Sequence, residues 1–311
     1  MGAAGFVTLV GHFTGSDLTG WRIMVGPSVI VLPQWQGSVR PLARQLVSGA
    51  ARLAALARGM GAQVLEPDGF GAGRSPLRDG VDSYDVLLAA HARATQVLPD
   101  GPLLAIGGDC GADLSLAARA LRHYEGELAI VWIDAHADFN TPASSPSGAF
   151  HGMVLRSLTG VGPDGLTAPV AALPSSLVLA GTRSIDAAEQ HQLTAVGVEP
   201  LGMRALTEPA SVADQLRRTG CSAVHVHLDL DVLDPAVFPY TTYQEPGGAT
   251  IGQVLGLLET IDRALPVTSA FVGEHLGGDE LDTAAVAPLL EQLLSSIGRP
   301  ARWEGGNRGR C

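Results

Sequence analysis

The chain of 311 residues is long enough to bury a large core, and its 46% hydrophobic and 16% charged composition excludes a disordered protein. A net charge of −11 argues against a nucleic-acid binder, because phosphate contacts need clustered Lys and Arg side chains. No apolar run approaches the ~20 residues of a membrane span. The three cysteines, Cys110, Cys221 and Cys311, are too few and too scattered for a disulfide framework. We therefore expect a cytoplasmic protein that binds neither nucleic acid nor membrane.

Short apolar runs alternate with longer amphipathic segments along the chain. The pattern predicts strands at 28–33, 62–67, 102–107, 128–135, 176–182, 196–202, 223–230 and 269–275, of which 196–202 is the weakest. It predicts helices at 40–59, 83–97, 112–123, 186–194, 209–219, 250–264 and 283–297. Strands that are apolar on both faces and alternate with helices are typical of a parallel sheet covered on both sides. Because no linker or repeat interrupts the pattern, we expect a single domain.

Acids and histidines follow three of the predicted strands, where ligands of parallel sheets bind. They are Asp109 with Cys110, then Asp134, His136 and Asp138, and finally Asp229, Asp231 and Asp234. Alternate residues of an extended segment share one face, so the members of a group converge if the strand continues. The alternative is that each acid caps a helix or faces solvent. So many carboxylates would repel one another without a cation, and oxygen ligands with one imidazole suit a bridged pair of divalent ions, manganese first.

The order of motifs GGDC, DAHADFNTP, HGM, HLDLDVLDP and GE resembles the binuclear manganese ureohydrolases of the arginase, agmatinase and formimidoylglutamase family. The resemblance covers roughly residues 25–300, with 1–24 as an N-terminal extension and 301–311 as a C-terminal tail. It implies an α/β fold, a single three-layer domain with a mostly parallel eight-stranded sheet, which assembles as a trimer or hexamer. It also implies two Mn²⁺ ions bridged by Asp134 and Asp229, with Asp138 on one ion and His136 and Asp231 on the other.

Cys110 stands where the family pattern GGDHS has a histidine ligand to the first metal. A thiolate is softer than an imidazole and would move the metal preference toward Co, Zn or Fe. The alternative is a buried structural cysteine, which is the commoner role for this residue. The cysteine and the altered loop at 240–248 resemble the branch of the family that hydrolyses Nω-hydroxy-L-arginine, from which His151 departs.

The resemblance implies catalytic roles for three residues. Glu274 would pair with the guanidinium group of the substrate, His151 would relay protons, and Asp138 would steady the attacking water. Alone, Glu274 would be a charge at a strand end and His151 an ordinary exposed histidine. Thr242 and Tyr243 replace the smaller residues of a Gly-Thr-Pro loop and would reshape the pocket around the reacting nitrogen.

The loops after the DAHAD motif point to the other end of the substrate. Asn140, Ser145 and Ser147 occupy positions that hold an α-carboxylate in arginases, and Asp186 and Glu189 occupy positions directed at an α-ammonium group. The alternatives are a turn-rich polar loop for the first three and a helix cap with a capping box for the last two.

These residues together predict a guanidino substrate with a free amino-acid end. We expect cleavage of L-arginine or Nω-hydroxy-L-arginine to ornithine and urea or hydroxyurea. Two alternatives stay open: another ureohydrolase, such as an agmatinase, a guanidinobutyrase or a formimidoylglutamase-like enzyme, and a weakly active metal-binding member of the family.

Overall fold

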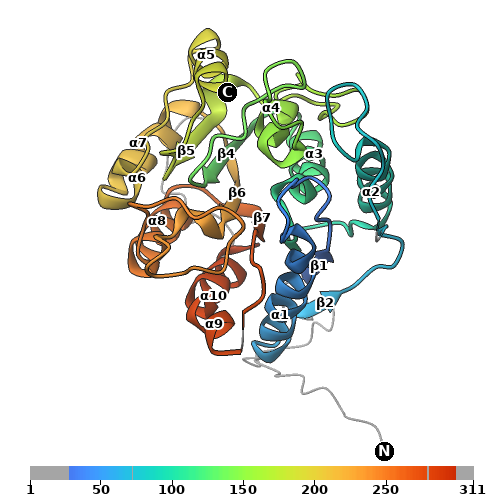
Figure 1. The fold of residues 1–311 in the computed structure, drawn as a ribbon. Coiled ribbons are helices and arrows are strands. Elements are labelled where there is room, and N and C mark those ends of the chain that lie inside the picture. Colours follow the sequence, from blue (N-terminus) through green and yellow to red (C-terminus); the bar gives the residue numbers. More distant parts are fainter. Residues whose placement is uncertain (1–27, 72, 279, 299–311) are drawn as a thin grey trace, which may run out of the picture.

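The computed structural model describes residues 28–71, 73–278 and 280–298 (Figure 1). The predicted N-terminal extension 1–24 and C-terminal tail 301–311, including Cys311, lie outside these residues. Cys221 is buried in the core. No helix in the described ranges is long and apolar enough to cross a membrane.

Seven strands form one sheet in the order β2-β1-β3-β7-β6-β4-β5, and every pair of neighbours is parallel. The strands are β1 Ser28–Leu32, β2 Gln63–Leu65, β3 Leu103–Gly107, β4 Leu128–Ile133, β5 Leu177–Ala180, β6 Ala223–Asp229 and β7 Val267–Gly273. Strands β3, β4 and β6 are buried along their whole length, as their continuous apolar runs predict.

The predicted eighth strand, at 196–202, is wrong. This segment joins the sheet through an isolated bridge between Gly202 and Ala180, at the end of β5, and a hydrogen bond from Leu201 N to the Leu179 carbonyl, and it forms no strand. Gly197 and Gly202 have φ values of +74° and +57°, which interrupt an extended backbone, and Pro200 has no N–H to donate to a neighbouring strand. The described residues therefore form a seven-stranded parallel sheet.

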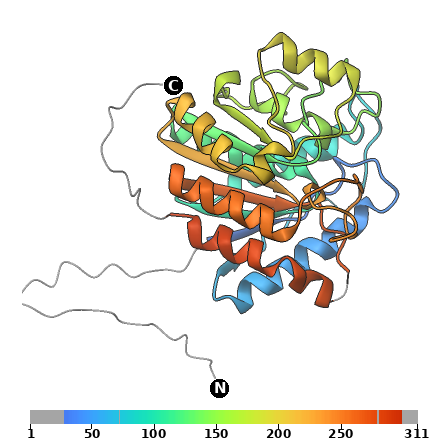
Figure 2. The same cartoon turned by 90° about the vertical axis from the view of Figure 1, so that its left-hand side faces the viewer.

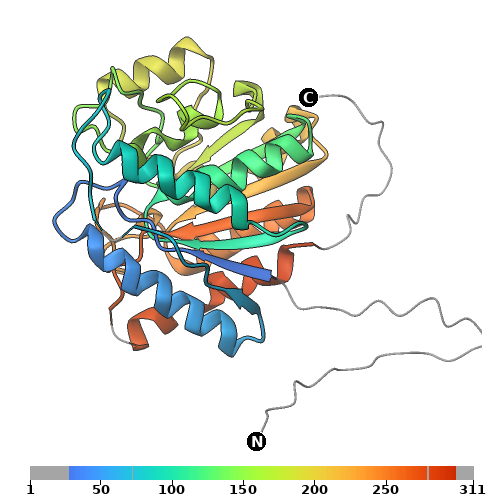
Figure 3. The ribbon, with the colours of Figure 1, turned by 90° about the vertical axis from the view of Figure 1, so that its right-hand side faces the viewer.

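Helices cover both faces of the sheet, as Figures 2 and 3 show. Helices α1, α6, α7, α8 and α10 pack on one face, and α2, α3 and α4 pack on the other. The helices are α1 Leu46–Gly59, α2 Tyr84–Val97, α3 Asp113–His123, α4 Val154–Leu158, α5 Ala187–Ala195, α6 Arg204–Thr207, α7 Ala210–Thr219, α8 Ile251–Ala264, α9 Glu280–Ala285 and α10 Ala287–Ser296. The three-layer arrangement follows from strands that are apolar on both faces.

Four central strands place the polar loops together. β3, β7, β6 and β4 are consecutive neighbours in the sheet although they lie far apart in the sequence. All are parallel, so the loops that follow them leave the same edge. The close approach of these loops requires glycine after β3, because a Cβ on Gly108 would lie 1.9 Å from the carbonyl oxygen of Gln34.

Candidate metal centre and active site

The predicted acids converge at this edge, but through turns rather than through extended strands. β4 ends at Ile133, before Asp134, and β6 ends at Asp229, after which Leu230–Val232 forms a 3₁₀ turn, η5. The turn folds Asp231 back, so that its backbone N–H donates to Asp229 Oδ1 at 2.7 Å. The strands do not continue through these acids, and the turns bring the acids together instead.

One group of candidate ligands lies around His136. Its Nδ1 is 3.0 Å from Asp231 Oδ2 and 3.4 Å from Asp134 Oδ1. The backbone N–H groups of His136 and Ala135 donate to Asp134 Oδ1 and Asp231 Oδ1 at 2.6 and 3.1 Å. One ligand atom of each of these two acids and of His136 lies within 4.8 Å of the others, a separation that suits a single cation.

A second group surrounds Cys110, which begins the 3₁₀ turn η2 (Cys110–Ala112) after β3. The thiol is 1% exposed and donates to Asp229 Oδ2 at 3.1 Å. Ligand atoms of Cys110, Asp134, Asp138 and His227 lie within 4.8 Å of one another, and a further group joins Cys110, Asp229 and Glu274. Asp134 therefore belongs to the groups on both sides, a position that suits a residue bridging two ions.

The electrostatics of the cluster call for positive charge. Burial raises the pKa values of Asp134, Asp138 and Asp229, and the neighbouring carboxylates raise them further. Burial also raises the pKa of the Cys110 thiol well above its ordinary value, with the charge of Asp229 adding to the effect. Asp231 differs: burial would raise its pKa, but the charge and hydrogen bond of His136 outweigh burial and lower it.

Divalent cations fit this donor set. Among the described residues, Asp138 Oδ2 and His227 Nε2 are buried and have no hydrogen-bond partner, although both belong to the Cys110 group. Buried polar atoms without partners are costly, and a cation would satisfy both of them and the surrounding carboxylates.

Glu274 lies beside the Cys110 group, directly after β7. It is 1% exposed, and its Oε2 accepts a hydrogen bond from the Thr242 hydroxyl at 2.8 Å. Its Oε1 lies 3.2 Å from His151 Nδ1. Burial would lower the pKa of His151, but the bond to Glu274 outweighs it and raises the pKa. The Tyr243 ring is centred 5.3 Å from the His151 ring.

Two non-glycine residues of the site have left-handed backbones. Asp138 has φ +50° and Glu274 has φ +62°. Each such residue costs about 1–2 kcal/mol, and costs of this kind cluster at functional sites. Here the Asp138 carbonyl accepts from Arg156 N at 3.2 Å, and Glu274 N donates to the Gly108 carbonyl at 2.7 Å. These bonds hold both turns in place.

The predicted substrate-binding residues form a network next to the cluster. Asn140 Nδ2 donates to Asp186 Oδ2 at 2.9 Å, and Glu189 Oε1 accepts from Phe139 N at 2.7 Å, one residue after Asp138. Asp186 caps α5 as the alternative interpretation predicts, but Glu189 does not complete a capping box. Burial raises the pKa of Glu189 to about 7.

Other predicted residues have local partners. Ser145 Oγ accepts from Gly148 N at 3.1 Å and the exposed Ser147 Oγ accepts from Ala149 N at 3.2 Å, so both stabilise their own turn. Asp109 Oδ2 accepts from Gly37 N at 2.7 Å, and Asp234 accepts from the backbone N–H groups of the loop at 247–248. These two acids belong to no group of candidate ligands among the described residues.

Sequence reasoning missed His227 as a member of the site. It lies two residues before Asp229 on β6, and residues two apart on a strand share a face. This period-two signal was available in HLDLD, but a histidine inside an apolar strand is usually a packed core residue.

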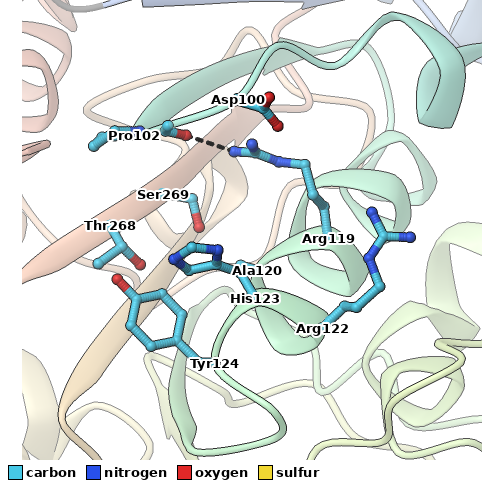
Figure 4. A pocket seen from close by; sticks show the side chains of 10 residues that line it. Asp100, Pro102, Arg119, Ala120, Arg122, His123, Tyr124, Thr268 and Ser269 are labelled. Atoms are coloured by element: carbon cyan, nitrogen blue, oxygen red, sulfur yellow. Dashed lines mark hydrogen bonds between the residues drawn. The ribbon is translucent and has the colours of Figure 1, made fainter.

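A separate pocket of about 480 Å³ opens at the opposite end of the sheet (Figure 4). It is lined by Arg119, Arg122 and Tyr124 at the end of α3 and by Thr268 and Ser269 at the start of β7. It therefore lies away from the acids, which follow the carboxyl ends of the strands.

Comparison with known proteins identifies the family. Residues 71–275 match the model of the arginase family. An arginase of Staphylococcus aureus (strain MRSA252) is 32% identical over 212 residues, which are 63% of this chain and 66% of that protein, just under two thirds of its length. An arginase of Bacillus caldovelox is 36% identical over 214 residues, 64% of this chain and 70% of that protein. The crystal structure of the Bacillus caldovelox arginase superposes with a TM-score of 0.74 at 25% identity, covering 88% of this chain and 99% of that one. The chain therefore belongs to the arginase family, whose members are hydrolases that act on linear amidines.

Proposed function

We propose that the chain is a binuclear-metal amidinohydrolase that cleaves the guanidino group of L-arginine or Nω-hydroxy-L-arginine, to give ornithine and urea or hydroxyurea. The observation that carries the proposal is the position of Asp134, which belongs to two adjacent groups of metal-binding side chains. The relatives named arginase support the choice of substrate class.

The proposed ligands are side chains at the carboxyl edge of the sheet, all of them buried except the half-buried His136. They are Cys110, Asp134, His136, Asp138, Asp229 and Asp231. We expect two Mn²⁺ ions, with Co, Zn or Fe as competitors at Cys110 because a thiolate is a softer ligand. When bound, such a pair lowers the pKa of a water molecule so that it can attack near neutral pH, and it stabilises the charge that develops.

Glu274 would hold the planar guanidinium by charge-assisted hydrogen bonds. Thr242 fixes one oxygen of this carboxylate, and His151 lies at the other. Burial would lower the pKa of His151, but the bond to Glu274 outweighs it and raises the pKa, which favours the protonated imidazole that would pass a proton to the leaving amine. Asp138, a proposed ligand beside the attacking water, would hold that water in position.

The amino-acid end of the substrate would bind at the neighbouring network. Asp186 is exposed and would meet an ammonium group at the edge of the centre, and the buried Glu189 would place a second carboxyl beside the Asp138 turn. Asn140, Ser145 and Ser147 supply amide and hydroxyl groups for the carboxylate from the same loop.

A substrate panel tests the proposal. L-Arginine, Nω-hydroxy-L-arginine and agmatine are each supplied to the protein loaded with manganese, cobalt or zinc, and urea, hydroxyurea and ornithine are measured. We expect turnover of an amino-acid substrate in preference to agmatine. Preferred turnover of agmatine would contradict the proposal. A cytoplasmic location stays a prediction. Assembly as a trimer or hexamer also stays a prediction, and light scattering would test it.

A further inference from the structure

We propose that His227 is a further protein ligand of the cation held at Cys110, and that Asp113 orients it for this role. The proposal rests on the binuclear function proposed above. It adds a ligand at a position where the family pattern SxDxDxxDP has a serine and this chain has HLDLDVLDP.

The His227 ring is held between two aromatic rings on one face of the sheet. The side chain is fully buried on β6, between Trp132 of β4 and Phe271 of β7, the residues that pair with it in register. The Trp132 ring lies 3.4 Å from it at an interplanar angle of 6°, and the Phe271 ring lies 4.8 Å from it at 9°. This stack fixes the plane of the imidazole, so its two nitrogens point in fixed directions.

Asp113 determines which nitrogen is available. Its Oδ2 lies 2.8 Å from His227 Nδ1 and 2.9 Å from His225 Nε2. An ionised carboxylate only accepts hydrogen bonds, so both of these nitrogens carry protons. His227 Nε2 is then left with a lone pair. A histidine that binds a metal through one nitrogen commonly donates to a carboxylate through the other.

The free nitrogen belongs to the Cys110 group. His227 Nε2 has no hydrogen-bond partner among the described residues, and neither has Asp138 Oδ2. The ligand atoms of His227, Cys110, Asp134 and Asp138 lie within 4.8 Å of one another. Metal–sulfur and metal–nitrogen bonds of about 2.3 and 2.1 Å hold two ligand atoms of one cation at most about 4.4 Å apart, which is close to the spacing of this group, so the group suits a single cation.

The two halves of the centre then differ in chemistry. The half at Cys110 offers a thiolate and an imidazole with carboxylates, a donor set that favours zinc or cobalt. The half at His136 offers one imidazole and mostly carboxylate oxygens, which favours manganese. We therefore expect the Cys110 half to select the softer ion when both are supplied.

Cobalt titration of the full chain, first stripped with a chelator, tests the ligand role. The wild-type protein is expected to bind two ions, one of which gives a thiolate-to-cobalt charge-transfer band. His227→Ser should weaken binding at the ion that gives the band at least about a hundredfold, because a direct ligand is lost. His225→Ser is the matched control: it removes an equally buried imidazole with the same Asp113 contact but outside the metal group, and should keep the band and both ions.

Asp113→Asn tests the positioning role. The amide can donate where the carboxylate only accepts, so we expect cobalt affinity to fall about 10- to 100-fold with the thiolate band retained. Unchanged affinity would overturn the orienting role.

X-ray absorption of the wild-type chain with one equivalent of zinc decides the question even if the variants do not fold. We expect sulfur and imidazole on the same ion. Sulfur without imidazole, or an unchanged charge-transfer band in His227→Ser, would overturn the ligand role while leaving the proposed function standing. A wild-type protein that binds no metal would instead overturn the proposed function.

Discussion

Asp186→Ala separates two roles that the structure gives to one carboxylate. Asp186 Oδ1 accepts hydrogen bonds at 2.9 Å from the backbone N–H groups of Ala188 and Glu189, and so caps α5. Its Oδ2 accepts from Asn140 Nδ2 and belongs to the side proposed to face the substrate ammonium. The substitution removes the cap and the charge together, and the two losses are measured differently.

The two losses have distinct magnitudes. Removing an N-cap costs about 1 kcal/mol, which lowers Tm by roughly 2–4 °C in a domain of this size. A hydrogen bond to a charged group is worth about 1.5–3 kcal/mol, which corresponds to a KM roughly 10- to 100-fold higher for arginine. The ammonium lies far from the bond that breaks, so kcat should change little.

A matched variant and a matched substrate keep the two roles apart. Asp186→Ser retains a good cap, so Tm should recover while KM stays high. 5-Guanidinopentanoate, which is arginine without its amino group, should show the same KM with the wild-type and Asp186→Ala proteins. The reasoning is refuted if Asp186→Ala leaves the KM for arginine unchanged, or raises it equally for the substrate without an ammonium.

Five further substitutions, at four residues, test the centre and its surroundings. Asp134→Ala or Asp229→Ala should abolish activity and reduce bound metal, measured by elemental analysis, to one ion or none; two retained ions with near-full activity would contradict the bridging assignment. Cys110→His should shift the metal preference toward manganese, and Cys110→Ser should empty the first site. If Cys110 is only a packed core residue, Cys110→His should instead be the disruptive change, and a thermal melt should show a loss of about 1–3 kcal/mol in the free energy of unfolding. Glu189 has a folded pKa of about 7, above that of an unfolded Glu, so its contribution to stability is present below about pH 4.5 and is lost as pH rises to 7. Glu189→Gln should therefore flatten the pH dependence of metal-free stability over that range by up to roughly 3 kcal/mol, and an unchanged slope would count against the burial argument.

The strands with continuous apolar runs could be predicted because each is buried on both faces. The segment at 196–202 shares part of that pattern, since Val196, Val198 and Leu201 are apolar. Its failure to form a strand depends on local backbone geometry at Gly197 and Gly202, which hydrophobic periodicity does not register. Hydrophobic periodicity depends only on side-chain polarity and carries no information about the positive φ values that glycine permits.

The sequence predicts most of the residues that make up the site, but not which of them contact one another. The acids at each strand end can be recognised in the sequence. The contacts between Cys110 and Asp229 and between Thr242 and Glu274, however, depend on β3, β7 and β6 being neighbours in the sheet. That order is a tertiary property, set by crossovers of many residues. His227 was missed for a related reason: its role depends on Asp113, which lies 114 positions away.

Contacts within the protein hold several residues of the candidate centre in place. Asp138 and Glu274 adopt left-handed backbones that local preference opposes, and each is held by a backbone bond to another segment. His227 is stacked between two aromatic rings, and Asp113 sets its proton. In such a site the side chains that would bind metal and substrate are already close to their final positions before binding, because folding has supplied the free energy needed to arrange them. The departures from local rules therefore coincide with the residues proposed to do the chemistry, as expected where function and not stability determines the conformation.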